Sequence, residues 1–362
     1  MRIAFYAPLK SPDHPVASGD RQMARLLINA LRRGGHHVEL VSQMRGYVRQ
    51  PDRECLDAIK AEAETEIDRL TGLWKRGRKP DLWFCYHPYY KAPDLIGPAL
   101  SARFAISYVT AEASYSRRRN LGSWAETQRL VAAGVEQAAL NICFTKRDRE
   151  GLSIVAPGAV LGMLPPFIDT SPFVKLAPSP CPSRLVTVAM MRPGDKLESY
   201  RMLARALQLI ADPDWSLSVV GDGPSRAEVF ALFAGIPSER ITWHGEVEPD
   251  EVPAILCQGG IYVWPGYGEA YGVAYLEAQA AGLPVVAQNV AGVPEVVRNR
   301  RTGLLTAPDD VPAFAAAIAS LLTHNNEKAA MAEAARRFVL EERSLEIASK
   351  RLAELFRKAG VS

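Results

Sequence analysis

The sequence has little of what would mark a cross-linked, membrane-spanning or nucleic-acid-binding protein. Its 362 residues include only five cysteines, which are scattered and form no Cys-x-x-Cys pair, so neither a disulfide framework nor a thiolate metal site is expected. No apolar run approaches the roughly 20 residues needed to cross a bilayer. Charge of one sign is also scarce: 43 Lys and Arg face 40 Asp and Glu, which argues against a nucleic-acid partner.

The first residues, MRIAFYAP, contain an apolar stretch that stops at Pro8. This stretch is too short for the apolar core of a secretory signal. Dispersed cysteines also suit a reducing compartment. We therefore expect a cytoplasmic protein, either free or peripheral at the inner face of the membrane.

The composition that remains is that of a globular chain, with 48% hydrophobic and 23% charged residues. The length predicts two domains. The charge is unevenly divided, because residues 1–182 hold 25 Lys and Arg against 18 Asp and Glu, whereas residues 183–362 hold 18 against 22. A basic first half favours an acidic partner or an anionic surface, or it reflects no more than uneven solvated charge.

Short β-branched and aromatic runs alternate with amphipathic segments, which predicts parallel sheets covered by helices on both faces. The expected strands are residues 3–7, 38–42, 82–86, 105–109 and 141–144, then 185–190, 216–220, 241–244, 261–264 and 285–288. The expected helices include residues 20–33 and 122–138, then 199–211, 271–281 and 312–322.

Six prolines lie within residues 165–182, and they forbid a helix and supply no ladder donors. The division we predict is a first domain, a proline-rich linker, a second domain and a C-terminal helix: 1–170, 171–182, 183–340 and 341–362. Apolar residues along one face of the segment 344–358 call for a partner surface, for which the first domain is a candidate. In sheets of this type, ligands bind in the loops after the strands.

The most informative window is PGYGEAYGVAYLEAQAAGLPVVAQNVAGVPEVV, residues 265–297. Glycines between a strand and the start of a helix let backbone N–H groups approach a diphosphate. Seven residues separate Glu269 from Glu277, and carboxylates accept hydrogen bonds from the neighbouring hydroxyls of a sugar or ribose. Because Glu277 lies inside an apolar run, it needs polar partners if it is buried.

This window resembles the retaining glycosyltransferases of family 4, whose second domain carries Glu-x7-Glu in a similar setting, followed here by AGVPEVV and the turn TGLL at 302–305. The resemblance implies the GT-B fold, with two Rossmann-like domains facing across a cleft, and same-face transfer of a sugar from a nucleotide-diphosphate-sugar. It assigns Glu277 to the ribose and Glu269 to the donor sugar. The backbone of Ala270, Tyr271, Gly272 and Val273 would meet the phosphates. No metal or other cofactor is required.

The resemblance also calls for cations near the departing diphosphate. Lys196 suits one role, and Arg192 stands two places after the expected arginine position, which Met190 occupies, so either the loop is shifted or that role is weakened. The sequence VVGDGPSR (219–226) lacks the third glycine of a dinucleotide fingerprint and predicts a tight structural turn. His244 lies where the family receives the nucleotide base, and the alternative is a structural histidine.

In the first half, the loop LKSPDHPVASGD delivers Gly19 to a helix start, where it would approach the donor phosphate and the acceptor, while Ser18 and Asp20 would cap the helix. The cluster YHPYYKAPD gathers His87, Tyr89 and Tyr90, which suit a sugar face and its hydroxyls.

Many family members place a histidine where this sequence has Glu112. We therefore also expect Glu112 at the acceptor or sugar site, with sugar recognition altered by the replacement.

The expected acceptor is a glycan, a lipid-linked sugar or a small molecule. The basic runs KRGRK (75–79) and RRR (117–119) would engage an acidic acceptor or anionic lipid, or remain solvated. Two other functions stay open. One is a non-catalytic nucleotide-sugar-binding protein, and the other is an NAD-dependent oxidoreductase, which the missing third glycine disfavours.

Overall fold

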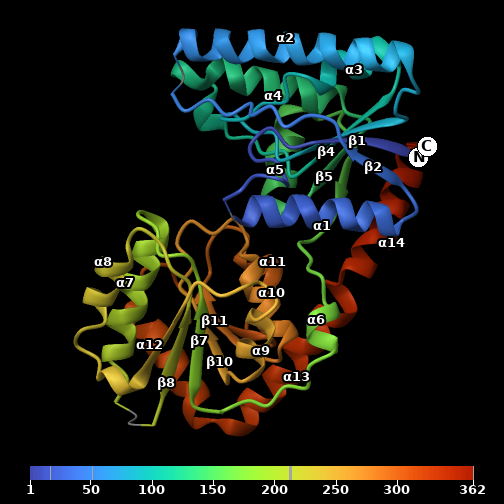
Figure 1. Ribbon diagram of the computed structural model, residues 1–362. Coiled ribbons are helices and arrows are strands. Elements are labelled where there is room, and N and C mark those ends of the chain that lie inside the picture. The colour runs from blue at the N-terminus through green and yellow to red at the C-terminus, as the bar shows by residue number, and fades with distance from the viewer. Residues whose placement is uncertain (17, 51, 212–213, 362) are drawn as a thin grey trace. The chain divides into compact units, whose positions relative to one another are not determined.

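A computed structural model describes residues 1–16, 18–50, 52–211 and 214–361. Ala17 of the first loop and Ser362 of the C-terminal segment therefore lie outside the described residues. The chain divides into two compact units (Figure 1). Unit 1 comprises Met1–Pro165 together with Leu345–Ser362, and unit 2 comprises Pro166–Ser344. Each unit contains one six-stranded sheet whose paired strands are all parallel, as the alternating pattern of the sequence predicts.

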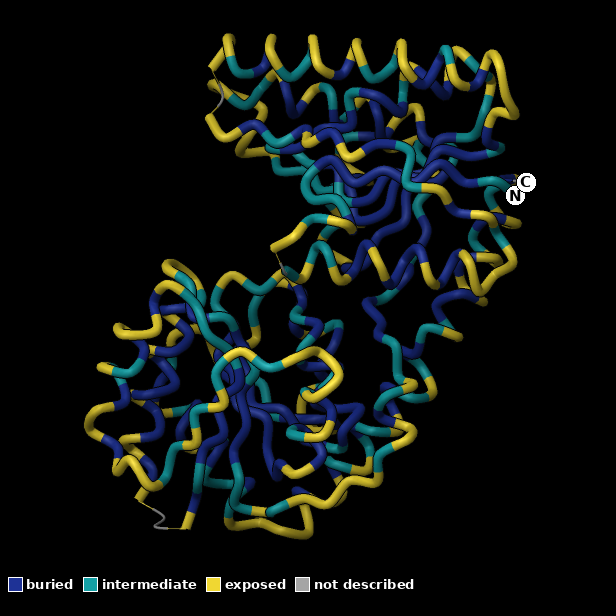
Figure 2. Tube along the Cα trace, in the orientation of Figure 1, coloured by how far each residue is buried: buried dark blue, intermediate teal, exposed yellow. Residues whose placement is uncertain are grey.

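The sheet of unit 1 has the order β2-β1-β3-β4-β5-β6. All five residues of β3, LWFCY, are buried, which agrees with a strand covered on both faces (Figure 2). The strands are β1 (Arg2–Tyr6), β2 (His37–Leu40), β3 (Leu82–Tyr86), β4 (Ser107–Ala111), β5 (Leu140–Cys143) and β6 (Leu161–Met163).

Helices cover both faces of this sheet, with α2, α3 and α4 on one side and α1 and α14 on the other (Figure 1). Asp52 and Thr145 begin α2 and α5 by accepting hydrogen bonds from the backbone of the first turn. The helices are α1 (Gly19–Arg33), α2 (Arg53–Arg76), α3 (Gly97–Phe104), α4 (Ala125–Gln137), α5 (Lys146–Val155) and α14 (Leu345–Lys358), with 3₁₀ turns η1 (Arg117–Arg119) and η2 (Gly122–Trp124).

The C-terminal helix α14 belongs to unit 1, as its apolar face requires. It packs along α1, and the Phe356 ring lies edge-on to Phe84 of β3 at 6.5 Å between centroids. Leu355 presses against Gly162 so closely that a Cβ there would lie 2.6 Å from a Leu355 methyl. The last residues of the chain therefore complete the core of the unit that contains the first residues.

The sheet of unit 2 has the order β12-β11-β10-β7-β8-β9. Its strands are β7 (Arg184–Val188), β8 (Ser216–Val220), β9 (Ile241–Gly245), β10 (Ile261–Val263), β11 (Val285–Gln288) and β12 (Gly303–Thr306). The central strands β10 and β11 are fully buried, and α7 packs with α12 on one side while α10 packs with α13 on the other (Figure 1).

The helices of unit 2 connect these strands. They are α6 (Ser171–Val174), α7 (Asp195–Gln208), α8 (Arg226–Leu232), α9 (Val252–Cys257), α10 (Val273–Ala280), α11 (Val293–Val296), α12 (Val311–Thr323) and α13 (Asn325–Glu342), with the 3₁₀ turn η3 (Ser238–Arg240). None of the helices in the described part of the chain is long and apolar enough to span a bilayer.

Three sequence expectations on local structure are wrong. The segment 165–182 contains the short helix α6, because Pro172 lies in its first turn, where a missing N–H costs nothing. The turn expected at 302–305 is instead strand β12, paired with β11. The strand expected at 105–109 begins two residues later, since Ala105 takes a left-handed conformation that ends α3. Glu112 therefore follows β4 directly.

Candidate functional site

Glu269 of unit 2 lies in the loop between β10 and α10 and contacts two other side chains. Its Oε1 forms an ion pair with the Lys196 ammonium and accepts a hydrogen bond of 3.2 Å from the Trp264 indole N–H. The side chain of Glu269 is 17% exposed and that of Lys196 is 30% exposed. The two residues are 73 positions apart in sequence, and the carboxyl ends of β7 and β10 bring them together.

The Trp264 side chain contacts both members of this ion pair. The Lys196 ammonium lies 5.5 Å from the centroid of its ring, and the ring is fully buried. Tyr200 of α7 meets the same ring edge-on at 5.0 Å, and its hydroxyl donates to the Ala189 carbonyl at 2.6 Å. The packed rings of Trp264 and Tyr200 therefore support both Lys196 and Glu269.

The glycines of the loop are needed for its own packing. Gly266 and Gly268 have φ values of +83° and +65°. A Cβ on Gly266 would lie 2.2 Å from the Tyr275 hydroxyl, and one on Gly268 would lie 2.0 Å from Oδ2 of Asp195. These contacts explain both glycines without a ligand, so the glycines by themselves do not establish a phosphate site.

Glu277 lies in α10 and is half-buried. Burial raises the pKa of the Tyr262 hydroxyl well above its usual range, and the negative charges of Glu269 and Glu277 raise it further. Both carboxylates thus influence the ionisation of one buried hydroxyl. Of the loop residues between them, Tyr271 is buried, and the Ala270 carbonyl accepts a hydrogen bond of 2.7 Å from Gly292.

The loop around Gly272 and Val273 has a similar structural explanation. Gly272 has a φ of +78°, and a Cβ on it would lie 2.5 Å from the Tyr275 ring. Val273 is buried and begins α10. The backbone here is well ordered by packing, and the predicted phosphate contacts of these residues remain predictions.

Two other residues named from the sequence lie at the edge of this arrangement. Arg192 follows β7 and is half-buried. His244 is exposed and forms the extra residue of a bulge, since Trp243 and Gly245 pair with consecutive residues of β8. Burial, followed by the charge of Arg184, lowers the pKa of His244. Within the described residues, no contact joins His244 to Lys196 or Glu269.

The 219–226 turn packs against the loop after β7. Gly221 and Gly223 have φ values of +135° and +153°, and a Cβ on either would lie within 2.4 Å of the carbonyl of Ala189 or Met191. Arg226 starts α8 and forms an ion pair with Asp222 at 2.9 Å. These glycines shape the loop that precedes Lys196.

Four titratable side chains converge at the carboxyl end of the sheet in unit 1. They follow strands β1, β3, β4 and β5 in turn: Asp20, His87, Glu112 and Asp148. Nδ1 of His87 lies 2.9 Å from Oδ1 of Asp20. The side chain of His87 is 19% exposed and Glu112 is buried.

The charges of this cluster are coupled. Burial alone would lower the pKa of His87, but the carboxylates of Glu112 and Asp20 raise it to about 9. Burial raises the pKa of Glu112 to about 7, against the attraction of His87. Burial also opposes ionisation of Asp20, yet the hydrogen bond with His87 and its charge lower the pKa of Asp20. These shifts favour the protonated form of His87, in which both ring nitrogens are donors.

The backbone is unusual at two members of the cluster. His87 and Glu112 have φ values of +57° and +56°, which cost energy in residues other than glycine. Their N–H groups donate to the carbonyls of Ala111 and Ile142, each at 2.8 Å. The positive φ therefore changes the direction of each side chain, while the backbone N–H of each residue still bonds to the neighbouring strand, β4 for His87 and β5 for Glu112.

A row of aromatic rings extends from His87. His87 stacks on Tyr89 at 5.1 Å, Tyr89 meets Tyr90 edge-on at 5.3 Å, and Tyr90 meets Trp124 edge-on at 5.0 Å. All four rings are half-buried. We call these four residues the aromatic row.

Ser18 and Gly19 begin α1, as expected. The Ser18 hydroxyl accepts a hydrogen bond of 3.2 Å from the N–H of Arg21, whereas Asp20 pairs with His87 instead of capping. Among the described residues, no atom would lie within 4 Å of a Cβ on Gly19, so open space lies beside this glycine.

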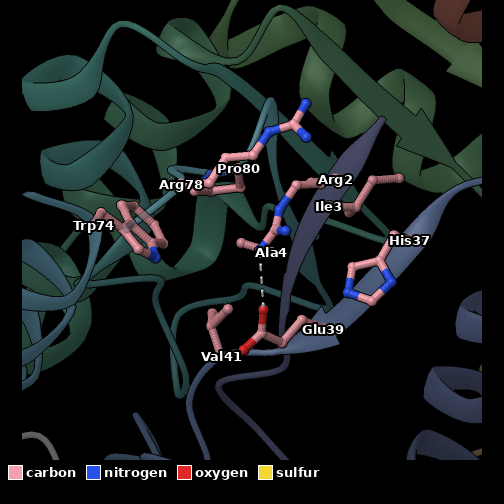
Figure 3. A pocket seen from close by; sticks show the side chains of 9 residues that line it. All are labelled: Arg2, Ile3, Ala4, His37, Glu39, Val41, Trp74, Arg78 and Pro80. Carbon is pink, nitrogen blue, oxygen red and sulfur yellow. Dashed lines mark ion pairs between the residues drawn. The ribbon is translucent and has the colours of Figure 1, made fainter. Parts of the chain in front are cut away.

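A small pocket of unit 1 lies at the opposite end of the sheet (Figure 3). It lies beside the starts of β1 and β2, with Arg2 and Glu39 4.0 Å apart at its edge, and its volume of about 10 Å³ admits no sugar. Arg78 of the basic run 75–79 lines it, whereas the run 117–119 follows β4 at the carboxyl end. The two basic runs therefore do not form one surface.

Across residues 1–16, 18–50, 52–211 and 214–361, no group of three or more His, Cys, Asp and Glu side chains is arranged to hold a metal ion. Sequence reasoning missed Asp148 as a member of the cluster and assigned Asp20 to a cap. Ligands bind in the loops after the strands in sheets of this type, and both residues lie after a strand. Asp20 follows β1, and Asp148 comes five residues after β5.

Comparison with known proteins identifies the class. The family model for glycosyl transferases group 1 matches residues 182–324, which lie within the second unit. Solved glycosyltransferase structures align with almost the whole chain. Sucrose-phosphate synthase from Thermosynechococcus elongatus covers 99% of it and is itself 98% covered, with a TM-score of 0.73 at 18% identity. The fold is therefore GT-B.

Among particular relatives, the chain is 32% identical over 249 residues to D-inositol 3-phosphate glycosyltransferase of Rhodococcus jostii, covering 66% of this chain and 54% of that protein. It is also 32% identical over 225 residues to a GDP-mannose-dependent phosphatidylinositol monomannoside mannosyltransferase of Mycolicibacterium smegmatis, covering 56% and 58%. The chain thus spans about half the length of these relatives. A structure of the Anabaena protein HepE in complex with UDP covers 99% of this chain and is fully covered, with a TM-score of 0.73 at 15% identity.

Proposed function

We propose that this protein is a retaining glycosyltransferase that moves a sugar from a nucleotide-diphosphate-sugar to an acceptor hydroxyl. The observation that carries the proposal is the Lys196–Glu269 ion pair over Trp264, within the unit that matches the family. A cation beside a half-buried carboxylate suits a ligand with a diphosphate next to a polyol, since the ammonium attracts phosphate oxygens and the carboxylate accepts from hydroxyls.

The donor side uses residues of unit 2. Glu277 accepts hydrogen bonds from the ribose hydroxyls, and Glu269 accepts from a hydroxyl of the donor sugar. Lys196, helped by Arg192, neutralises the charge that accumulates on the departing diphosphate. Backbone N–H groups of the loop from Ala270 to Val273 add to this stabilisation, and His244 borders the nucleotide base.

In the reaction, the acceptor oxygen forms a bond to the anomeric carbon from the face that the diphosphate leaves. The bond from that carbon to the phosphate oxygen breaks, and the acceptor proton passes to the departing diphosphate oxygen. Configuration is retained. Catalysis consists of positioning and electrostatics, so no metal or side-chain nucleophile takes part.

The acceptor side uses residues of unit 1. His87, Tyr89, Tyr90 and Glu112 bind the acceptor or the transferred sugar, and Gly19 lets the backbone of α1 approach the donor phosphate. The acceptor is a glycan, a lipid-linked sugar or a small molecule. We place the protein in the cytoplasm, in peripheral contact with the membrane when the acceptor is lipid-linked.

A screen of UDP-, GDP- and ADP-sugars tests this function. A matching donor should raise the melting temperature and be hydrolysed slowly without acceptor, and the released or transferred sugar should keep its anomeric configuration by NMR. Inverted product would contradict the retaining mechanism. Stabilisation by a nucleotide sugar with neither hydrolysis nor transfer would instead indicate a binding protein, and stabilisation by NAD alone would indicate an oxidoreductase.

A further inference from the structure

Several cations near the aromatic row have no acidic partner. Arg117, Arg118 and Arg119 are exposed, and Lys91 is half-buried. In the part of the chain that the structure describes, none of these four residues forms an ion pair. Glu126, the next acid after the three arginines in sequence, is already paired with Lys60 of α2.

Two of the cations lie over rings of the aromatic row. The guanidinium carbon of Arg119 is 4.9 Å from the centroid of Tyr90. The Lys91 ammonium is 6.0 Å from the centroid of Tyr90 and 5.8 Å from that of Trp124. A guanidinium stacked on a ring keeps its N–H groups along its edge, where they can bind carboxylate or phosphate oxygens.

Some other cations of unit 1 are neutralised by neighbouring acids. Arg69 forms an ion pair with Glu66 at 2.7 Å, and Arg53 one with Asp57 at 3.7 Å. Like charges without counter-charges repel one another, so gathering them beside half-buried rings is unfavourable in the free protein. An anion bound there would relieve that repulsion.

We propose that the surface formed by Lys91 and Arg119 over Tyr90 and Trp124 binds a negatively charged group, phosphate or carboxylate, on a sugar-containing acceptor. The inference rests on the proposed function only in naming the ligand an acceptor. That this surface binds an anion does not depend on the proposed function. Aromatic rings pack against the apolar faces of a sugar, and the two cations hold its anion. His87 lies at the other end of the row, beside Asp20, and that end is left for the reacting hydroxyl.

The anion has two sources, a soluble sugar or a lipid headgroup. Leu121, between the arginines and Trp124, is 85% exposed, which suits contact with a lipid surface. Glucose 6-phosphate and glucose serve as the soluble probes. Vesicles of phosphatidylcholine with and without phosphatidylglycerol serve as the lipid probes.

Calorimetry on the full chain should show glucose 6-phosphate binding at least tenfold tighter than glucose, with an advantage that shrinks as salt rises. The double variant Lys91→Gln/Arg119→Gln should abolish that preference. Arg119→Lys keeps the charge and should retain most of it. The control Lys75→Gln/Arg78→Gln removes two cations from the other end of the sheet and should keep the preference. A circular-dichroism melt confirms that each variant is folded.

The protein could bind only vesicles that contain phosphatidylglycerol, with the double variant losing this binding. In that case the anion belongs to a lipid headgroup, and the proposed anion-binding surface is supported. Equal affinity for both sugars together with vesicle binding that the double variant does not change would overturn the proposal. Donor turnover is measured separately. Charge-dependent binding in a protein that turns over no nucleotide sugar would refute the proposed function and leave the anion site intact.

Discussion

The Lys196 ammonium and the Glu269 carboxylate form an ion pair over the buried Trp264 ring, although strands β8, β9 and β10 and helices α8 and α9 separate them in sequence. Each group neutralises the other in the free protein. In the proposed complex both gain ligand partners, the diphosphate for Lys196 and a sugar hydroxyl for Glu269. The pair thus keeps both side chains aimed and desolvated before the donor arrives.

Replacing Lys196 tests this relationship. Lys196→Gln should lower kcat about 10²–10³-fold, because the leaving diphosphate loses a preorganised cation. The measurement is steady-state transfer or donor hydrolysis. Arg201→Gln, an exposed change on the same helix, should stay within about twofold of wild type.

Lys196→Gln also leaves Glu269 without its counter-charge, which lowers stability. The double variant Lys196→Gln/Glu269→Gln should recover melting temperature without recovering kcat. A wild-type kcat in the single variant would refute the role of Lys196.

Glu277 should govern nucleotide affinity. Glu277→Ala should weaken nucleotide binding, since each charge-assisted hydrogen bond to a ribose hydroxyl contributes about 1.5–3 kcal/mol. Calorimetry with nucleoside diphosphate measures the change, and Glu228→Ala on the exposed side of α8 is the matched control. An unchanged dissociation constant in the Glu277 variant would rule out ribose binding by this residue.

A substitution at Gly19 distinguishes an effect on ligand binding, seen in activity, from an effect on folding, seen in the melting temperature. Because open space surrounds the site of its Cβ, Gly19→Ala should leave the melting temperature unchanged or slightly higher. If a phosphate or the acceptor approaches the backbone there, activity should fall about tenfold or more. Gly158→Ala, also in open space, should change neither quantity. Full activity in Gly19→Ala would show that nothing binds close to this residue.

His87 should make stability depend on pH. Its pKa is about 9 in the folded protein and about 6.5 when unfolded, so its stabilising contribution is complete below about pH 6.5 and is lost as pH rises through 9. At about 1.4 kcal/mol per pKa unit, the loss is of the order of 3 kcal/mol.

Denaturant unfolding at pH 6.0 and 9.5 measures this loss. Wild type should lose unfolding free energy over this interval, and His87→Gln should lose much less. Parallel declines in both proteins would show that His87 does not carry the effect. Glu112→Gln removes one of the carboxylates that raise the pKa of His87, so its decline should still begin near pH 6.5 but should be smaller and end at lower pH.

The strands and helices followed largely from local signals. Continuous apolar runs such as LWFCY predicted buried strands, and the spacing of apolar residues near the C-terminus predicted a helix with one buried face. The window around Glu269 and Glu277 predicted a glycosyltransferase, and the family model for glycosyl transferases group 1 matches the residues that contain it. The sequence predictions were wrong at two kinds of place. At Ala105 a single left-handed residue moves the start of a strand, and β12 is too short to show an alternating pattern of apolar residues.

The composition of the candidate sites depended on the tertiary structure. By itself, the sequence determined the alternation of strands and helices, the positions of loops after strands, and the residues able to bind sugars and phosphates. Only the tertiary structure decided that Lys196 meets Glu269 over Trp264 and that Asp20 holds His87 instead of capping a helix. It also separated the two basic runs to opposite ends of one sheet. The physical reason is that periodicity acts over a few neighbouring residues, whereas strand order and parallel register bring together side chains more than sixty positions apart.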